Sequence, residues 1–326
     1  MTRIVITDCD HPTIDQERAV AEAAGVELIL AQCRTEAEVI AAAQGADGVI
    51  VQYAPITRAV MEALPRLKVV SRYGVGVDTV DVGAAAELGV AVCNVPDYGT
   101  EDVSDHAIGL TVALTRGVAR FDRHMRAGGR DLAPAGALHR NNARVFGVLG
   151  LGEIGAATAR KAAGLGFRVI GADPRFAPGE ERNGVRVVSQ EELFASADVL
   201  SLHIPLIPAT HHLMNDAAFA SMKPGAVLIN TCRGGVVDTT ALLRALESGQ
   251  LSGAGLDVFE TEPLEAGHPL LEREDVVLTP HAAWYTEESF SELKTRTADH
   301  AARIVTGAPA LHVLNGATGV RVGASA

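Results

Sequence analysis

The sequence predicts an α/β protein of two domains, each built on a parallel sheet with helices on both faces. Its 326 residues are about twice the usual length of a single domain. Two separate stretches alternate short β-branched runs with Ala-rich helical runs. Such alternation indicates parallel strands joined by helical crossovers. A long helical stretch between the two series marks the point where one domain gives way to the next.

The first series contains five predicted strands, at 3–7, 26–30, 48–51, 67–71 and 90–93. Helical segments such as 17–24 and 81–88 lie between them. A single helix is then expected from about Glu101 to Arg126, ending at Gly128 and Gly129. Its length suits a connector that crosses from one domain to the other better than a local layer. Residues 128–142, rich in Gly, Pro and Asn, are predicted to form a loop.

The second series contains six predicted strands, at 144–150, 167–173, 197–203, 225–230, 253–259 and 275–280. A closing helix is expected from about Thr286 to Val305. If this helix packs back on the first sheet, the second domain is inserted in the first.

The composition is that of an ordinary globular protein and excludes several classes of function. Hydrophobic residues make up 48% of the chain and charged residues 21%, so no disorder is expected. The formal net charge is −12 and no block of Lys and Arg interrupts it, which disfavours nucleic acid as a partner. The first apolar run is too short for a signal sequence, and no run approaches the roughly 18 apolar residues of a membrane span. A cytoplasmic protein without a membrane partner is expected.

The cysteines give no sign of a metal site or a disulfide framework. Cys9, Cys33, Cys93 and Cys232 form no C-x-x-C pair and have no His at metal-ligand spacing. They are predicted to be reduced thiols, and no metal is expected.

A glycine-rich turn at 150–155 predicts a dinucleotide site. It follows an apolar run and opens into the helical segment 156–166. In such a motif the glycine at 150 permits the tight turn and the glycine at 152 lets the backbone approach a pyrophosphate. The glycine at 155 allows helix and strand to pack closely, so that the helix N-terminus faces the phosphates.

The acidic residue Asp173 extends this prediction to the nature of the dinucleotide. It ends the next predicted strand, roughly 20 residues after the first glycine, where a carboxylate meets the ribose of a bound dinucleotide. A carboxylate there binds the 2′-hydroxyl and repels a 2′-phosphate, which favours NAD over NADP. Arg175 lies two residues away and is able to soften that preference.

Three polar residues follow successive predicted strands and together predict redox chemistry on a 2-oxo acid. They are Arg233, Glu262 and His281, at the strand ends where open α/β sheets bind ligands. The planar guanidinium of Arg holds a carboxylate through two charge-assisted bonds. A His of ordinary pKa exchanges a proton with the carbonyl or hydroxyl oxygen. A nearby carboxylate favours the imidazolium and holds the ring.

The ordered motifs resemble those of the D-isomer-specific 2-hydroxyacid dehydrogenase family. They are GLGEIG, SLHIPL, INTCRGGVVD, GLDVFETEP and TPHAAWYT, preceded by RYGVGVD and AVCNVP. The resemblance covers nearly the whole chain. It implies two Rossmann-like domains with the active site in the interdomain cleft and a homodimer formed largely through the coenzyme domains. Residues 1–100 with 286–326 would form the substrate-binding domain, and 101–285 the NAD-binding domain.

The resemblance also assigns roles to individual residues. Arg233 would bind the substrate carboxylate and carbonyl, His281 would be the acid/base, and Glu262 its partner. The backbone at Val75 and Gly76 would meet the substrate carboxylate. The NAD contacts would be Gly150, Gly152, Glu153, Ile154, Gly155, Asp173, Ile204, Pro205, Thr210, Thr231, Cys232, Asp257 and Ala283.

Within the family, two branches share further features with this chain. The segments HHLMND and HAAWYT are similar to those of the C-terminal-binding proteins, in which Arg72 and Trp284 would shape the substrate pocket. Trp284 would then either offer an apolar face to a larger 2-oxo acid or serve only in packing. RYGVGVD is similar to the phosphoglycerate dehydrogenases, where Arg72 would lie near a phosphate. Cys232 replaces a small residue, and its thiol is either reactive or buried and inert.

Two functions remain as alternatives. The first is an NAD-dependent oxidoreductase that interconverts a 2-oxo acid and a D-2-hydroxy acid, including the D-3-phosphoglycerate dehydrogenase type. The second is a corepressor-like dimer that binds NAD(H) as a sensor. The complete Arg, Glu and His set favours the enzyme. The identity of the substrate depends on side chains from both domains and is left open.

Overall fold

The computed structural model describes residues 1–309 and 311–321. The chain divides into two compact units, one of Met1–Tyr98 with Thr286–Ala326 and one of Gly99–Tyr285. We call them the terminal unit and the central unit. Residues 310 and 322–326, which fall in the predicted segment 286–326, lie outside the described residues.

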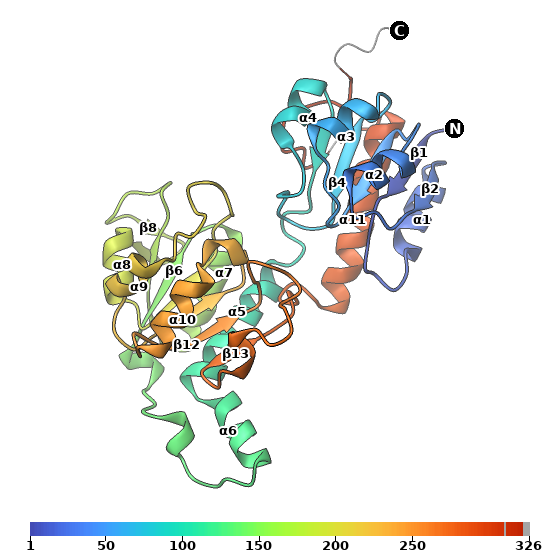
Figure 1. Ribbon diagram of the computed structural model, residues 1–326. Helices are drawn as coiled ribbons and strands as arrows, with labels where there is room; N and C mark the ends of the chain where they lie inside the picture. The colour runs from blue at the N-terminus through green and yellow to red at the C-terminus, as the bar shows by residue number, and fades with distance from the viewer. Residues whose placement is uncertain (310, 322–326) are drawn as a thin grey trace. The chain divides into compact units, whose positions relative to one another are not determined.

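The terminal unit is built on a five-stranded sheet in the order β2-β1-β3-β4-β5, with every neighbouring pair parallel. Its strands are β1 (Arg3–Ile6), β2 (Glu27–Leu30), β3 (Gly48–Val51), β4 (Val69–Arg72) and β5 (Ala91–Cys93). Its helices are α1 (Asp15–Ala23), α2 (Glu36–Ala42), α3 (Arg58–Ala63), α4 (Val82–Leu88) and α11 (Glu287–Thr306). The segment from the far end of the chain thus returns to this unit, where α11 crosses the sheet beside α1 (Figure 1).

Hydrophobic side chains alternate between the two faces of this sheet. Val49 and Val51 pack in one cluster with Val39 of α2 and Met61 of α3, because alternate residues of a strand point to the same face. On the opposite face α11 lies over β3 and β4. Gly48 makes this approach possible, because a Cβ there would lie 3.0 Å from a methyl carbon of Val305. The last helix therefore belongs to the first sheet, as it must if the central unit is inserted in the terminal one.

The central unit is built on an eight-stranded sheet in the order β13-β12-β11-β10-β6-β7-β9-β8. Its strands are β6 (Val145–Leu149), β7 (Arg168–Ala172), β8 (Glu181–Arg182), β9 (Val185–Val187), β10 (Val199–Leu202), β11 (Ala226–Asn230), β12 (Leu251–Leu256) and β13 (Val276–Leu278). The short β8 pairs antiparallel with β9, and the other pairs are parallel. Strands added after β6 lie first on one side of it and then on the other, which is the doubly wound Rossmann order.

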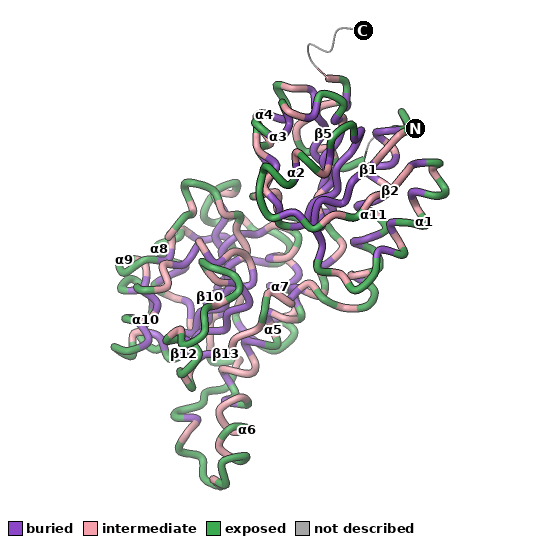
Figure 2. The backbone as a smooth tube through the Cα atoms, turned by 45° about the vertical axis from the view of Figure 1, so that its right-hand side comes forward, coloured by how far each residue is buried: buried purple, intermediate pink, exposed green. Residues whose placement is uncertain are grey.

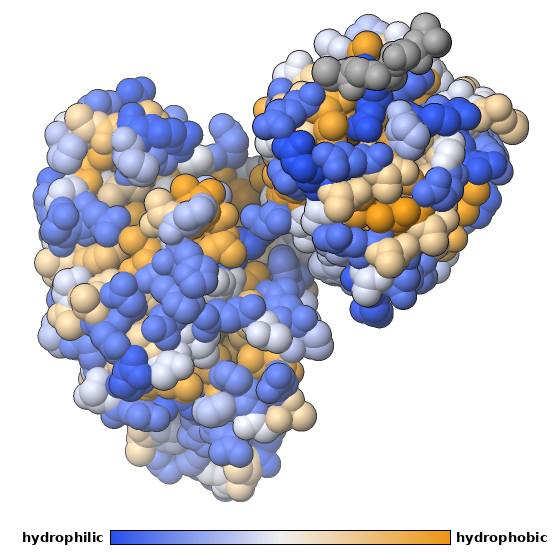
Figure 3. Space-filling model, turned by 45° about the horizontal axis from the view of Figure 1, so that its top comes forward, coloured by the Kyte–Doolittle hydropathy of each residue, from blue (hydrophilic) through white to orange (hydrophobic). Residues whose placement is uncertain are grey.

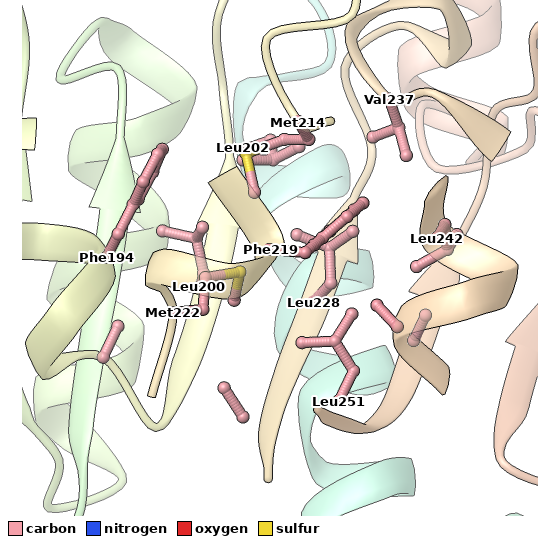
Figure 4. Packing of buried hydrophobic residues seen from close by; sticks show 14 of the residues in the cluster. Phe194, Leu200, Leu202, Met214, Phe219, Met222, Leu228, Val237, Leu242 and Leu251 are labelled. Carbon is pink, nitrogen blue, oxygen red and sulfur yellow. The ribbon is translucent and has the colours of Figure 1, made fainter. Parts of the chain in front are cut away.

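Helices cover both faces of the central sheet. They are α5 (Thr100–Thr115), α7 (Glu153–Gly164), α8 (Gln190–Ser196), α9 (Asp216–Ser221) and α10 (Thr239–Glu247). Helix α6 (Val118–Arg126) follows α5 and has no buried residue. Short 3₁₀ turns span Ala133–Ala135, Asn141–Ala143, Gly234–Val236 and Pro269–Glu272. Val199 packs with α5 and α7, whereas its neighbour Leu200 packs with α8, α9 and α10. Figure 4 shows this second layer, in which Phe194, Phe219 and Met222 surround Leu200. Both sheets form the buried centres of their units (Figure 2).

The prediction of a single helix from Glu101 to Arg126 is wrong, because Gly117 divides this segment into two helices. This glycine has a φ of 64°, a left-handed conformation that ends α5 and admits the new helix α6. A Cβ at this position would lie 3.0 Å from that of Ala135. Nor is α5 only a connector: it packs on α7, β11 and β12 as a layer of the central unit.

The surface of the protein is largely polar on the face shown in Figure 3. Hydrophilic residues cover most of the face drawn in Figure 3, and hydrophobic residues interrupt it in smaller areas. Among the described residues, no helix combines the length and the apolar character that crossing a membrane requires.

Candidate active site

The glycine turn lies where the sheet order of the central unit reverses. β6 ends at Leu149 and α7 begins at Glu153, and the strands on either side of β6 are β10 and β7. Crossovers leave this point in opposite directions, and sheets of this order bind ligands outside the carboxyl ends of the strands at such a point. Packing explains two of the three glycines. A Cβ on Gly150 would lie 2.3 Å from the carbonyl oxygen of His203, and one on Gly155 would lie 1.9 Å from that of Gly150.

Gly152 differs because no protein atom requires a glycine there. A Cβ added to it would have Arg175 Nη2 as its nearest neighbour, 4.0 Å away, and its φ of −74° suits any residue. It is the N-cap of α7, and no side chain caps the helix. The positive end of the helix is therefore open to an anion, and the residues present fit the pyrophosphate of a dinucleotide.

Asp173 is bound on both carboxylate oxygens. It is 7% exposed at the end of β7 and accepts a hydrogen bond of 2.8 Å from the Leu151 amide. The guanidinium of Arg175 donates to both oxygens, at 2.8 and 2.6 Å. These side-chain hydrogen bonds lower the pKa of Asp173 to about 2, against the opposing effect of burial. The carboxylate predicted to meet the ribose thus already holds Arg175, whose side chain is 61% exposed.

The remaining predicted cofactor residues follow β10, β11, β12 and β13. Thr231 Oγ1 is buried and makes no hydrogen bond within the described structure, so it is available to a bound group. Thr210 instead donates to the Pro205 carbonyl, at 2.6 Å. Cys232 donates its thiol to Asn230 Oδ1, at 3.1 Å, and burial raises its pKa. This arrangement favours the inert thiol over the reactive one, because the thiolate is disfavoured.

The three predicted catalytic residues follow three neighbouring strands. Arg233 follows β11, Glu262 follows β12, and His281 follows β13. His281 Nδ1 lies 2.6 Å from Glu262 Oε2, and Glu262 Oε1 accepts the amide of Phe259 at 2.9 Å. Burial alone would raise the pKa of Glu262, but the hydrogen bond and charge of His281, together with the amide of Phe259, contribute to a net lowering of that pKa. The charge of Arg233 acts in the same direction.

His281 itself has an unusual backbone conformation. Its φ is 54°, in the left-handed region that residues other than glycine rarely adopt and that costs about 1–3 kcal/mol. Its amide donates to the Asp257 carbonyl at 2.7 Å, and its carbonyl accepts from the indole of Trp284 at 3.0 Å. The Asp257 carboxylate accepts the amides of Ala282 and Ala283, both at 2.9 Å. The backbone of the loop is therefore held at His281 and at the two residues after it.

Comparison with known proteins identifies the chain. The model of the D-isomer specific 2-hydroxyacid dehydrogenase NAD-binding domain matches residues 108–283. A glyoxylate reductase of Korarchaeum cryptofilum is 42% identical over 250 residues, which are 76% of this chain and 75% of that protein. The chain belongs to the D-isomer specific 2-hydroxyacid dehydrogenase family. The predicted family, fold class and NAD cofactor are confirmed, and this dehydrogenase is an NAD-dependent oxidoreductase that acts on CH–OH groups.

Two further relatives show how far the resemblance extends. A D-3-phosphoglycerate dehydrogenase of Methanocaldococcus jannaschii is 35% identical over 97% of this chain, which spans only 60% of that protein. A solved structure from Thermus thermophilus aligns with 96% of the chain and all of its own length, at 33% identity and a TM-score of 0.86.

The predicted substrate residues of the dehydrogenase are divided between the units. Arg72 ends β4 in the terminal unit, followed by Val75 and Gly76. The carbonyl of Val75 accepts the side-chain amide of Asn94 at 2.7 Å, and the Val75 residue is 40% exposed. Trp284 is in the central unit. Its indole N–H donates to the His281 carbonyl, so it helps to hold the loop that carries His281.

Sequence patterns did not single out two side chains that complete this loop. Thr279 donates its hydroxyl to Asp257 Oδ1 at 2.6 Å, and His106 Nε2 lies 2.9 Å from Thr279 Oγ1. Asp257, predicted as a cofactor contact, is fully buried and is used to organise the loop; its contact with the cofactor stays a prediction. The only sequence signal for Thr279 was its position at a strand end. His106, in the middle of a helix, had none.

Proposed function

We propose that this enzyme interconverts a 2-oxo acid and a D-2-hydroxy acid by hydride transfer. The observation that carries the proposal is the His281–Glu262 contact of 2.6 Å, with Arg233 at the end of the neighbouring strand. NADH, when bound, supplies the hydride. The open N-terminus of α7 and the buried hydroxyl of Thr231 are the groups that would hold it.

The proton would pass through one particular atom of His281. Because Nδ1 is held by Glu262, Nε2 is the nitrogen left to face the substrate oxygen. In reduction, protonated His281 gives its Nε2 proton to the oxygen as the carbonyl becomes a hydroxyl; in oxidation it takes the proton back. Glu262 holds the ring in one orientation through its contact with Nδ1.

The substrate carboxylate would be held by Arg233. Its guanidinium donates two parallel hydrogen bonds to a carboxylate, which fixes the neighbouring carbonyl carbon for attack. We propose the backbone at Val75 and Gly76 as a second carboxylate contact, with Arg72 and Trp284 as the residues nearest the rest of the substrate. The relatives' names define the substrates to try. Beside the glyoxylate reductase and the phosphoglycerate dehydrogenases, the solved structures include D-lactate dehydrogenases and a D-2-hydroxyisocaproate dehydrogenase.

The test is the oxidation of NADH, followed at 340 nm, with a panel of 2-oxo acids. The panel contains glyoxylate, pyruvate, hydroxypyruvate, its 3-phosphate and 2-oxoisocaproate. Reduction of at least one of them, with the D-hydroxy acid as product, is expected. If none of these acids causes oxidation of NADH, or if the product is the L-hydroxy acid, the proposal is contradicted. Preference for the phosphorylated substrate, lost on Arg72→Ala, would place the enzyme with the phosphoglycerate dehydrogenases.

The role of His281 is tested by His281→Ala. Turnover should fall by at least about a thousandfold, the contribution of an acid/base group, while the Kd for NADH changes little. A variant with near-parental kcat contradicts the assignment.

The role of Arg233 is tested by Arg233→Lys. A point charge cannot form the two parallel hydrogen bonds, so kcat/KM should fall by about 10–100-fold, the loss of one charged hydrogen bond. An unchanged kcat/KM contradicts the carboxylate clamp.

We also propose that the enzyme is a homodimer joined through the central unit. Helix α6 has no buried residue, and with the following loop it extends away from the sheet of the central unit (Figure 1). Val118 is 54% and Met125 61% exposed on this helix, and Leu132 is 78% exposed in the loop. A second copy covering these side chains would remove them from water. Light scattering should give twice the chain mass, and Met125→Asp should shift the mass towards the monomer; a monomeric parent contradicts the proposal.

A further inference from the structure

The loop that carries His281 needs support because its backbone is strained. At a φ of 54°, the imidazole stays in place only if the surrounding contacts outweigh the cost of that conformation. Three hydrogen bonds to the Asp257 carboxylate contribute to that support, from the Thr279 hydroxyl and from the amides of Ala282 and Ala283. The Asp257 side chain is 1% exposed, so water does not compete for them.

The direction of the hydrogen bonds identifies a fourth member of this network. A hydroxyl has one hydrogen, and that of Thr279 goes to the Asp257 carboxylate, which only accepts. The Thr279 oxygen is therefore an acceptor for His106 Nε2, 2.9 Å away, and His106 must carry its hydrogen on Nε2. The result is a directed series of hydrogen bonds from His106 through Thr279 to the Asp257 carboxylate, which also accepts the amides of Ala282 and Ala283, directly after His281.

His106 is placed by a rigid element. It lies on α5, whose Ala107 and Leu110 are buried in the core of the central unit. Its ring is 26% exposed, and Nε2 lies 3.7 Å from Asp257 Oδ1. In sequence it is 173 residues from Thr279. Through the imidazole of His106, helix α5 thus connects the loop of His281 to the sheet of the central unit.

We propose that His106 is a positioning residue for the acid/base His281, acting through Thr279 and Asp257. This inference rests on the proposed function, in which His281 exchanges the substrate proton. His106 contacts neither substrate nor cofactor in this scheme. Its N–H orients the Thr279 hydroxyl, the hydroxyl orients the Asp257 carboxylate, and the carboxylate holds the loop in its strained conformation.

Two matched pairs of variants test the chain of hydrogen bonds. His106→Leu removes the donor, whereas His106→Gln keeps an N–H at a similar reach. Thr279→Val removes the hydroxyl with little change of shape, whereas Thr279→Ser keeps it. We expect kcat to fall roughly 10-fold in the Leu and Val variants, the effect of one ordinary hydrogen bond, with the KM for NADH unchanged. The Gln and Ser variants should recover most of that loss.

The double variant His106→Leu with Thr279→Val distinguishes a chain from two separate contacts. If His106 acts through Thr279, the double variant loses no more activity than either single variant. Multiplicative losses, equal losses in His106→Gln and His106→Leu, or parental kcat in His106→Leu would each overturn the inference. If His106→Leu fails to fold, the Thr279 pair still gives the answer, because Thr279→Val leaves the helix intact.

A second readout does not depend on activity. Hydrogen–deuterium exchange of the peptide that contains Ala282 and Ala283 should be faster in the Leu and Val variants and near parental in the Gln and Ser variants. Unchanged exchange in all four overturns the inference. If instead the parent reduces no 2-oxo acid, or His281→Ala remains active, the proposed function fails, and the exchange data still decide whether His106 holds the loop.

Discussion

Replacing Gly152 or Gly155 by alanine separates the packing of the cofactor turn from its binding of the cofactor. Both glycines belong to the same short motif, and sequence reasoning assigns both to NAD. The structure distinguishes them. Gly155 faces the backbone of its own turn, whereas Gly152 faces no protein atom closer than 4.0 Å. The two substitutions should therefore act on different properties of the enzyme.

The expected magnitudes follow from the distances. In Gly155→Ala the new Cβ would lie 1.9 Å from the Gly150 carbonyl oxygen, about 1.1 Å inside the 3.0 Å limit of real Cβ contacts. Forced packing of this kind costs about 1–3 kcal/mol or more of folding free energy. In Gly152→Ala the methyl meets open space, and the N-cap loses a few tenths to about 1 kcal/mol. The pyrophosphate, however, would lose its close approach to the backbone; one charged hydrogen bond is worth about 1.5–3 kcal/mol, or roughly 10–100-fold in Kd.

Two measurements are needed, with a control on the same helix. NADH affinity is measured by quenching of the single tryptophan, and stability by thermal unfolding without cofactor. Gly152→Ala should bind NADH at least 10-fold more weakly with a midpoint within about 3 °C of the parent, and Gly155→Ala should lose both. Gly164→Ala, at the end of α7 where a Cβ meets nothing within 4 Å, should change neither. If Gly152→Ala bound NADH as tightly as the parent, the proposed close approach of the pyrophosphate to the backbone at Gly152 would be wrong.

Three further perturbations test the charges. Glu262→Gln replaces the charged partner of His281 Nδ1, 2.6 Å away, by a neutral one, so kcat should fall roughly 10-fold; an unchanged kcat would contradict the pairing. The side chains of Lys294 and Glu17 are 1% and 0% exposed, and their charged atoms lie 3.6 Å apart. Lys294→Met leaves the Glu17 carboxylate buried without this cation and should lower the free energy of unfolding by about 3 kcal/mol. An unchanged free energy of unfolding would mean that other groups satisfy Glu17. The pKa of Asp173 is lowered from 3.8 to about 2, so its charge stabilises the fold above pH 4 and that contribution is lost towards pH 2. Asp173→Asn should lower the free energy of unfolding by about 1–2 kcal/mol at pH 7, less than the pKa shift alone implies because the guanidinium of Arg175 is exposed. The difference in stability between variant and parent should vanish near pH 2. A difference that does not depend on pH would show that the charge of Asp173 is not its cause.

Local pattern predicted most of the strands but missed β8 and β9 of the central sheet, which are two and three residues long, and it failed for one helix. The predicted strand at 48–51 has the bounds of β3, and 225–230 differs from β11 by one residue, because a buried parallel strand is a short run of β-branched and aliphatic residues. The segment from Glu101 to Arg126 has helical spacing throughout, yet Gly117 divides it. A glycine in a helical pattern is tolerated, and whether it turns left-handed depends on what packs beside it; here that neighbour is Ala135.

The site shows the same limit. Residue type and position at strand ends identified Arg233, Glu262 and His281, because parallel strands bring their carboxyl ends to one edge. Nothing local revealed that Asp173 is bound to Arg175 through both oxygens. The part played by Asp257 was equally hidden, because its carboxylate partners are 22–26 residues away in the chain.

Residue types and their spacing were enough to predict most of the alternation of strands and helices, the glycine turn, and the chemical groups that the proposed reaction requires. These depend on residue type and short spacing, which a linear pattern contains. The tertiary structure decided which groups meet: α11 against the first sheet, the imidazole of His281 against Glu262, and His106 against Thr279. Hydrogen bonds act over about 3 Å, and only the order of the strands and the path of the loops bring atoms from distant parts of the chain within that distance.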